Sequence, residues 1–107
     1  MTTFDDRENA FESKFAHDQE LEFKAVARRD QLVGMWAAGL MGLEGQRQEE
    51  YGAAVVRAEL GRAGEETVLR KLMQDLEAAG QKVSEGEIRR KMDELLAQSR
   101  EALKGEA

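Results

Sequence analysis

Four side chains in the first half of the chain could recognise a phosphorylated ligand. Lys24 and Arg28 stand four residues apart, a spacing that places two side chains on one face of a helix. Arg29 and Trp36 stand seven residues apart and share another face. Guanidinium groups suit phosphate recognition, and an indole ring can stack on a nucleobase. These residues are therefore candidates for a nucleotide-binding site.

A purely structural interpretation competes with this one. Cations in a highly charged helical protein are usually solvated surface residues, and the apolar neighbours of Trp36 also suit its ring to a core. Further cations are equally good phosphate ligands by type, namely Arg70, Lys71, Arg89 and Arg90. The sequence leaves open which of these cations converge.

Residues for catalysis or metal binding form no recognisable arrangement. The chain has no GxxxxGK[ST], GxGxxG or HExxH motif. It has no cysteine, which excludes disulfides and thiolate chemistry, and it has a single histidine, His17. His17 could be a pH-sensitive group where an N-terminal segment meets the rest of the chain, or simply a solvated helix residue. We predict no enzymatic activity, no metal site and no required cofactor.

A stretch near the N-terminus, FDDRENAFESKF, indicates a different kind of site. Phe4, Phe11 and Phe15 recur at intervals of seven and four residues, within about 40° of one another on a helix. The other positions are mostly charged, so the stripe is narrow. Helices shorter than about 12–15 residues are marginal in water, so the segment alone would be partly disordered. It could pack over the remaining helices as a peripheral fifth helix, or bind a groove on another protein.

Helical periodicity covers the remainder of the chain. Apolar spacings of three and four residues predict helices over 20–41, 47–60 and 65–79, and a last helix after Ser84, which forms a capping box with Glu87. Thr3 can cap the N-terminal segment, and Gly42, Gly45 and Gly80 mark helix ends. The residues expected to face inward are Leu21, Ala25, Leu32, Met35, Trp36, Leu40, Tyr51, Ala54, Val55, Ala58, Val68, Leu69, Leu72, Met73, Leu76, Ile88, Met92, Leu95, Leu96, Ser99 and Leu103. We predict an all-α fold, a four-helix bundle of antiparallel neighbours with a loosely attached N-terminal amphipathic segment.

Composition supports this fold and limits the partners. The 107 residues suffice for one domain, 36% of them are charged, and there is no proline. A net charge of −6 disfavours nucleic-acid binding, which needs a basic face. The longest apolar run, residues 32–43, is too short to span a bilayer, and the acidic N-terminus lacks the apolar region of a signal peptide. We expect a cytoplasmic protein without direct membrane insertion, and a monomer when free, because a four-helix bundle can close its own core.

Several pieces of the sequence are distinctive in combination. TTFDDRE, ESKFAHDQELEFKA, ARR and WAAGLMG lie in the first half, and RKLMQDLE and IRRKM lie in the later helices. Together they make the chain resemble the ζ subunit of the α-proteobacterial F-type ATP synthase, an ATPase inhibitor family. The likeness covers the whole chain, and only the loops around residues 42–50 and 61–67 depart modestly from the family pattern.

The resemblance implies a regulator that is peripheral to the membrane-bound synthase. Such proteins are four-helix bundles that inhibit ATP hydrolysis by the catalytic head of the synthase through their N-terminal segment. Carried over, residues 1–18 would be the inhibitory segment and residues 19–107 the bundle. The family is also associated with adenine nucleotides, so ADP or ATP is an expected ligand of the bundle.

Under this hypothesis the segment acts by obstruction. Rotary hydrolysis requires catalytic interfaces to open and close, and a helix inserted at one interface would hold it in one state. Phe4, Phe11 and Phe15 would be buried anchors. The charged residues that would set the register are Asp5, Asp6, Arg7, Glu8, Glu12 and Lys14. Two alternatives stay open: a helical adenine-nucleotide sensor, and an adaptor without strong inhibition.

Overall fold

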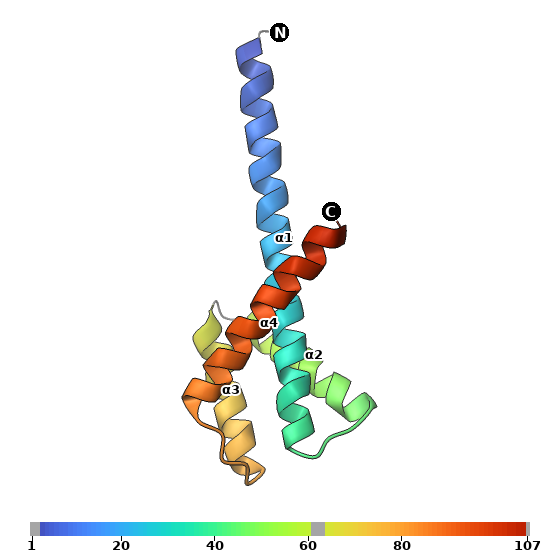
Figure 1. Ribbon diagram of the computed structural model, residues 1–107, viewed down its shortest axis with the longest axis vertical. Helices are drawn as coiled ribbons and strands as arrows, with labels where there is room; N and C mark the ends of the chain where they lie inside the picture. The colour runs from blue at the N-terminus through green and yellow to red at the C-terminus, as the bar shows by residue number, and fades with distance from the viewer. Residues whose placement is uncertain (1–2, 61–63, 107) are drawn as a thin grey trace.

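The described part of the chain is entirely helical. The computed structural model describes the backbone of residues 3–60 and 64–106, together with the side chains of residue 14 and of residues 16–59 and 64–105. These residues form α1 (Thr3–Leu40), α2 (Gln46–Leu60), α3 (Glu65–Ala78) and α4 (Glu85–Glu106), without a strand among them (Figure 1). The predicted all-α four-helix bundle is confirmed.

The first helix is longer than predicted. The separate helix expected to begin near Glu20 does not exist, because residues 3–40 form one helix of 38 residues. No proline or glycine occurs between residues 3 and 33, so a helix that is packed at its C-terminal end can propagate without interruption. At a rise of about 1.5 Å per residue it spans about 57 Å. This helix accounts for most of the longest dimension of the molecule, 64 Å.

Helix α1 is the central helix of the bundle. It packs against α2, α3 and α4, and α3 also packs against α2 and α4. Figure 1 shows α2 crossing behind α1 and α4 crossing in front of it, while the N-terminal part of α1 projects beyond the other helices. That segment therefore continues α1 and is not a peripheral fifth helix over the bundle. No break in the helix marks the predicted boundary between residues 18 and 19, which stays a prediction.

The core lies where the C-terminal half of α1 meets the three other helices. Its buried members are Val33, Ala37, Val55, Val68, Leu69, Leu72, Leu76, Ile88 and Met92. Trp36 and Tyr51 are half-buried against this cluster. Two residues predicted to face inward do not: Leu40 is the last residue of α1 and Met73 lies on the outer side of α3, and both are exposed.

Among the described residues, no helix has the length and apolarity needed to cross a membrane.

Two glycines let α1 and α2 cross at close range. A Cβ added to Gly34 would lie 2.8 Å from the Cα of Gly52, and a Cβ added to Gly52 would lie 2.7 Å from the carbonyl oxygen of Gln31. Gln48 Nε2 donates across the same crossing to the carbonyl oxygen of Met35 at 2.8 Å. Because Gly34 and Gly52 have no Cβ, the two helices can approach this closely.

Local capping fixes where the helices end. Gly42 and Gly80 adopt φ angles of +85° and +78° after α1 and α3, as the sequence predicted. At both ends the amide two positions after the cap residue bonds back to a carbonyl five residues earlier, Leu43 to Ala38 and Gln81 to Leu76, both at 2.9 Å. At the start of α4, the amide of Glu87 donates to Ser84 Oγ at 3.1 Å, which confirms the Ser84 half of the predicted capping box.

Candidate partner-binding segment and cation clusters

The N-terminal part of α1 is the first candidate site. Its backbone is helical from Thr3. Every described side chain in it is exposed, namely Lys14, Ala16, His17, Asp18, Gln19 and Glu20. The other predicted partner-binding residues are in this helix, but their side chains lie outside the described residues: Phe4, Asp5, Asp6, Arg7, Glu8, Phe11 and Phe15. Exposed His17 agrees with the interpretation of a solvated helix residue.

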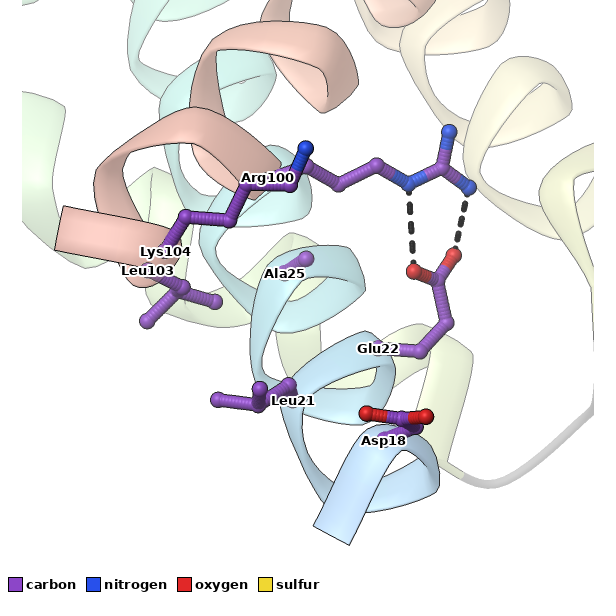
Figure 2. A pocket seen from close by; sticks show the side chains of 7 residues that line it. All are labelled: Asp18, Leu21, Glu22, Ala25, Arg100, Leu103 and Lys104. Carbon is purple, nitrogen blue, oxygen red and sulfur yellow. Dashed lines mark hydrogen bonds and ion pairs between the residues drawn. The ribbon is translucent and has the colours of Figure 1, made fainter. Parts of the chain in front are cut away.

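The junction between this segment and the bundle is held by an ion pair. Arg100 Nε donates to Glu22 Oε2 at 3.1 Å, and Arg100 Nη2 donates to Glu22 Oε1 at 2.5 Å (Figure 2). This two-point contact holds the pKa of Glu22 below its usual value and raises the pKa of Arg100. Both side chains line a cavity of about 190 Å³, together with Asp18, Leu21, Ala25, Leu103 and Lys104. The end of α4 is thereby fastened to α1 near the point where α1 leaves the bundle.

The four predicted nucleotide-binding residues do not converge. Lys24 is exposed and forms an ion pair with Glu20 at 3.3 Å, and Arg28 is also exposed. Arg29 is buried, with only 4% of its surface exposed, and is directed to α2. Trp36 faces α4 instead, where Lys91 Nζ lies 5.8 Å from the centre of its ring. Each of the four residues stays a predicted ligand, but the four side chains cannot all belong to one site.

Arg29 belongs to a buried ionic group that sequence reasoning missed. Its Nε donates to Asp30 Oδ1 at 2.7 Å, and its Nη2 lies 3.8 Å from Glu59 Oε1 on α2. Asp30 is 1% exposed, and this burial raises the pKa of its carboxyl although Arg29 opposes the shift. The two carboxylates thus pair with one guanidinium inside the bundle. The signal in the sequence was an Arg–Asp pair one turn before an apolar run.

Two cavities combine cations with other polar side chains. One, of about 260 Å³, is lined by Trp36, Glu87, Arg90, Lys91 and Glu94 between α1 and α4. The other, of about 300 Å³, is lined by Glu66, Thr67, Arg70, Lys71 and Gln74 on α3. Lys71 Nζ also contacts Asp75 Oδ2 at 3.1 Å. Arg89 lines neither cavity, but its Nη2 donates to Oε1 of Glu66 in the second one at 2.6 Å, and the pair raises the pKa of Arg89 and lowers that of Glu66.

The first cavity is the better fit to a nucleotide by residue type. It joins the chain's single tryptophan to two cations, Arg90 and Lys91, and so offers a ring for stacking beside phosphate donors. Two carboxylates also line it, Glu87 and Glu94, and Lys91 Nζ lies 3.3 Å from Glu94 Oε2. Lys91 was not among the predicted candidates, although it lies next to Arg90 in the sequence. Within the part of the chain that the structure describes, no group of three or more His, Asp or Glu side chains could hold a metal ion.

Comparison with known proteins relates the chain to one family. The model of the family described as ATPase inhibitor subunit zeta matches residues 1–102. A protein whose structure was determined in solution by NMR shares 38% sequence identity and superposes with a TM-score of 0.70, over 81% of this chain and 99% of that chain. None of the curated proteins compared with this chain matched it.

Proposed function

The chain belongs to the ATPase inhibitor subunit zeta family, and from that premise we propose that it inhibits ATP hydrolysis by inserting the N-terminal part of α1 at a catalytic interface of the F-type ATP synthase. The family assigns an inhibitory, regulatory role. The proposal adds the segment that acts, the site it occupies and the way it blocks the enzyme. In it, residues 1–18 inhibit and residues 19–107 form the bundle that carries them.

One observation carries the proposal: α1 continues as a helix well beyond the helices that cover it. All six described side chains between residues 14 and 20 are exposed, so this stretch has no core of its own (Figure 1). Binding of an amphipathic helix by its apolar face in a groove is a recurring mode of protein recognition. Phe4, Phe11 and Phe15 are the proposed anchors. The charged residues proposed to set its register are Asp5, Asp6, Arg7, Glu8 and Lys14.

The bundle contributes by starting the helix. Forming the first turn is the unfavourable step of helix formation, and each added residue then gains a hydrogen bond. Because residues 3–20 extend a helix that is already packed, they avoid that step. An inhibitor of this kind acts only as far as it binds one state of the interface better than the others.

The decisive experiment measures ATP hydrolysis by the isolated catalytic head. Full-length protein should inhibit, whereas a chain lacking residues 1–17 should be folded by circular dichroism and should not inhibit. A triple Phe4, Phe11 and Phe15 to alanine variant should lose inhibition while keeping the length and charge of the segment. Equal inhibition by the full-length and shortened chains would overturn the proposal.

We propose nucleotide sensing as a second function, supported by the cavity of Trp36, Arg90 and Lys91. Adenine would stack on Trp36, and the two cations would contact phosphate. Because Trp36 is the single tryptophan, titration with ADP and ATP can be followed by its fluorescence and by NMR. Arg90→Gln should weaken binding, and Arg70→Gln, in the other cavity, should not. Unmoved resonances at millimolar nucleotide would contradict this function.

The remaining proposals concern where the free chain is found. We propose a cytoplasmic monomer that is peripheral to the membrane-bound synthase and binds its catalytic head. Light scattering of the free chain tests the monomer, and co-sedimentation with membranes that carry or lack the catalytic head tests the attachment. Sedimentation that does not depend on the head would contradict it.

A further inference from the structure

Phe23 is the most exposed large apolar side chain among the described residues. It lies on α1 just after the N-terminal segment, and 62% of its surface is accessible. Leu40 and Met73, the other exposed large apolar residues there, reach 38% and 36%. Leaving an aromatic ring in water forgoes the gain of burying it, so a ring this exposed is a candidate contact for a partner.

A mainly apolar cavity lies beside Phe23. Its volume is about 360 Å³, and it lies between α1 and the C-terminal part of α2. Its walls are formed by Phe23, Val26, Ala27 and Val56, with Asp30, Glu59 and Gly64 completing the lining. An exposed ring at the rim of an apolar hollow resembles the core of a protein–protein contact, in which a protruding anchor pairs with a receiving pocket.

Phe23 lies on the same unbroken helix as the phenylalanines of the N-terminal segment, turned by about 80° from Phe15 around the helix axis. Phe11, Phe15, Phe23 and Ala27 all belong to one series of positions four residues apart, with Gln19 between the second and third. Residues at this spacing form one of the ridges that helices use in packing. Since α1 is unbroken, Phe23 follows Phe15 by about 12 Å along the same ridge. A partner that holds Phe15 and extends about 12 Å toward the bundle would therefore reach Phe23.

We propose that Phe23 and this cavity form a second contact with the catalytic head, beyond the inserted segment; this inference rests on the proposed function. The cavity fits an apolar side chain of the head with a lysine or arginine at its edge. Asp30 is buried against Arg29, so Glu59, whose side chain is 16% exposed, is the carboxylate of the lining that such a cation would meet. A second copy of this chain suits the cavity less, since each copy has a net charge of −6 and the two would repel.

The test places a photo-crosslinking benzoyl-phenylalanine at position 23 or, as a control, at position 73. Both sites are exposed in helices, so both chains should fold. Illumination in the presence of the catalytic head should crosslink the chain through position 23 and not through position 73. In hydrolysis assays, Phe23→Ala should require about tenfold more protein for the same inhibition. Met73→Ala should match the unmodified chain, and all variants should keep its thermal midpoint.

The outcomes separate this inference from the function on which it rests. If the unmodified chain does not inhibit hydrolysis, the proposed function and this contact are both overturned. If it inhibits, and Phe23→Ala inhibits equally well without a crosslink from position 23, only the second contact is overturned. Crosslinks through position 23 that join two copies of this chain, rather than the chain and the head, would also overturn it.

Discussion

At the residue scale, the most informative feature is a charged group inside a small bundle. Arg29 and Asp30 are almost fully buried, and Glu59 on α2 completes the group. Burial of charge is expensive, and removing one partner costs more than the pair contributes, because the other charge is left unpaired. The group therefore fixes which face of α1 meets α2 more than it adds to stability.

Replacing Arg29 should expose this cost. Arg29→Met should destabilise the fold by about 3–5 kcal/mol at neutral pH, because Asp30 would stay buried without its donor. Arg29→Lys keeps the charge and should lose less. Chemical denaturation of both variants measures the difference, and a loss below about 1 kcal/mol in the methionine variant would contradict this role.

The loss in Arg29→Met should also depend on pH. Burial already raises the pKa of Asp30, and removing Arg29, which lowers it, should raise it further. A carboxyl whose pKa is higher in the folded state stabilises the fold below its unfolded pKa, and this contribution is lost as pH rises through the folded pKa. The deficit should therefore be largest at neutral pH and shrink toward about pH 4. A deficit that grows on acidification would contradict the assignment to Asp30.

The glycines of the α1–α2 crossing give a second prediction at this scale. Alanine is favoured over glycine inside a helix by about 1 kcal/mol. At Gly52, however, the new Cβ would lie 2.7 Å from the backbone oxygen of Gln31, which cannot move alone. Gly52→Ala should therefore destabilise the fold by about 1–3 kcal/mol, measured by urea denaturation. Gly105→Ala, with open space around its Cβ, is the matched control and should be neutral or slightly stabilising.

At the scale of the elements, sequence periodicity predicted most of the fold. The helices after α1, their caps at Ser84 and Gly80 and the buried faces of α3 and α4 follow from local patterns, which need no knowledge of neighbours. The predicted start of α1 was wrong because its wide apolar face begins only near residue 20. The helix itself extends further toward the N-terminus, since propagation depends on the packed end and not on a local core. The pairing of Arg29 with Asp30 and Glu59 could not be predicted, because sequence spacing does not show what α2 places opposite Arg29.

The attachment of α4 to α1 gives a prediction at the same scale. Glu22→Gln removes the negative charge that pairs with Arg100 and so weakens the contact between α4 and α1. The amides of α1 around residues 18–25 should therefore exchange hydrogen faster at neutral pH. Arg100 keeps the pKa of Glu22 below its usual value of 4.5, so this stabilisation is present above pH 4.5 and is lost as pH falls through the folded pKa.

Exchange measured across this range should show the two chains converging in acid. Lys24→Gln is the control, because its partner Glu20 lies on the same helix and does not tie α4 to α1. A difference between Glu22→Gln and the unmodified chain that persists below the folded pKa of Glu22, where both side chains are uncharged, would contradict the assignment.

At the scale of the whole molecule, one end buries a core and the other end carries a helix outside it. The molecule measures 64 Å by 24 Å by 22 Å, and its described core begins with Ala25 on α1. A change in the N-terminal segment is therefore expected to leave the free energy of unfolding of the bundle nearly unchanged. This separation agrees with the proposed function, in which the bundle stays folded while another molecule binds the start of α1.

Deleting residues 1–17 tests this separation directly. Described side chains before Leu21 are exposed, so the deletion removes helix without removing described core contacts. The free energy of unfolding should change by less than about 0.5 kcal/mol, while the helical signal in circular dichroism falls in proportion to the residues removed. Leu72→Ala, which empties part of the shared core, should cost about 2–5 kcal/mol in the same assay. A shortened chain as unstable as Leu72→Ala would mean that the N-terminal segment is part of the fold, and an inhibitor that must release it to a partner would then have to unfold in order to act.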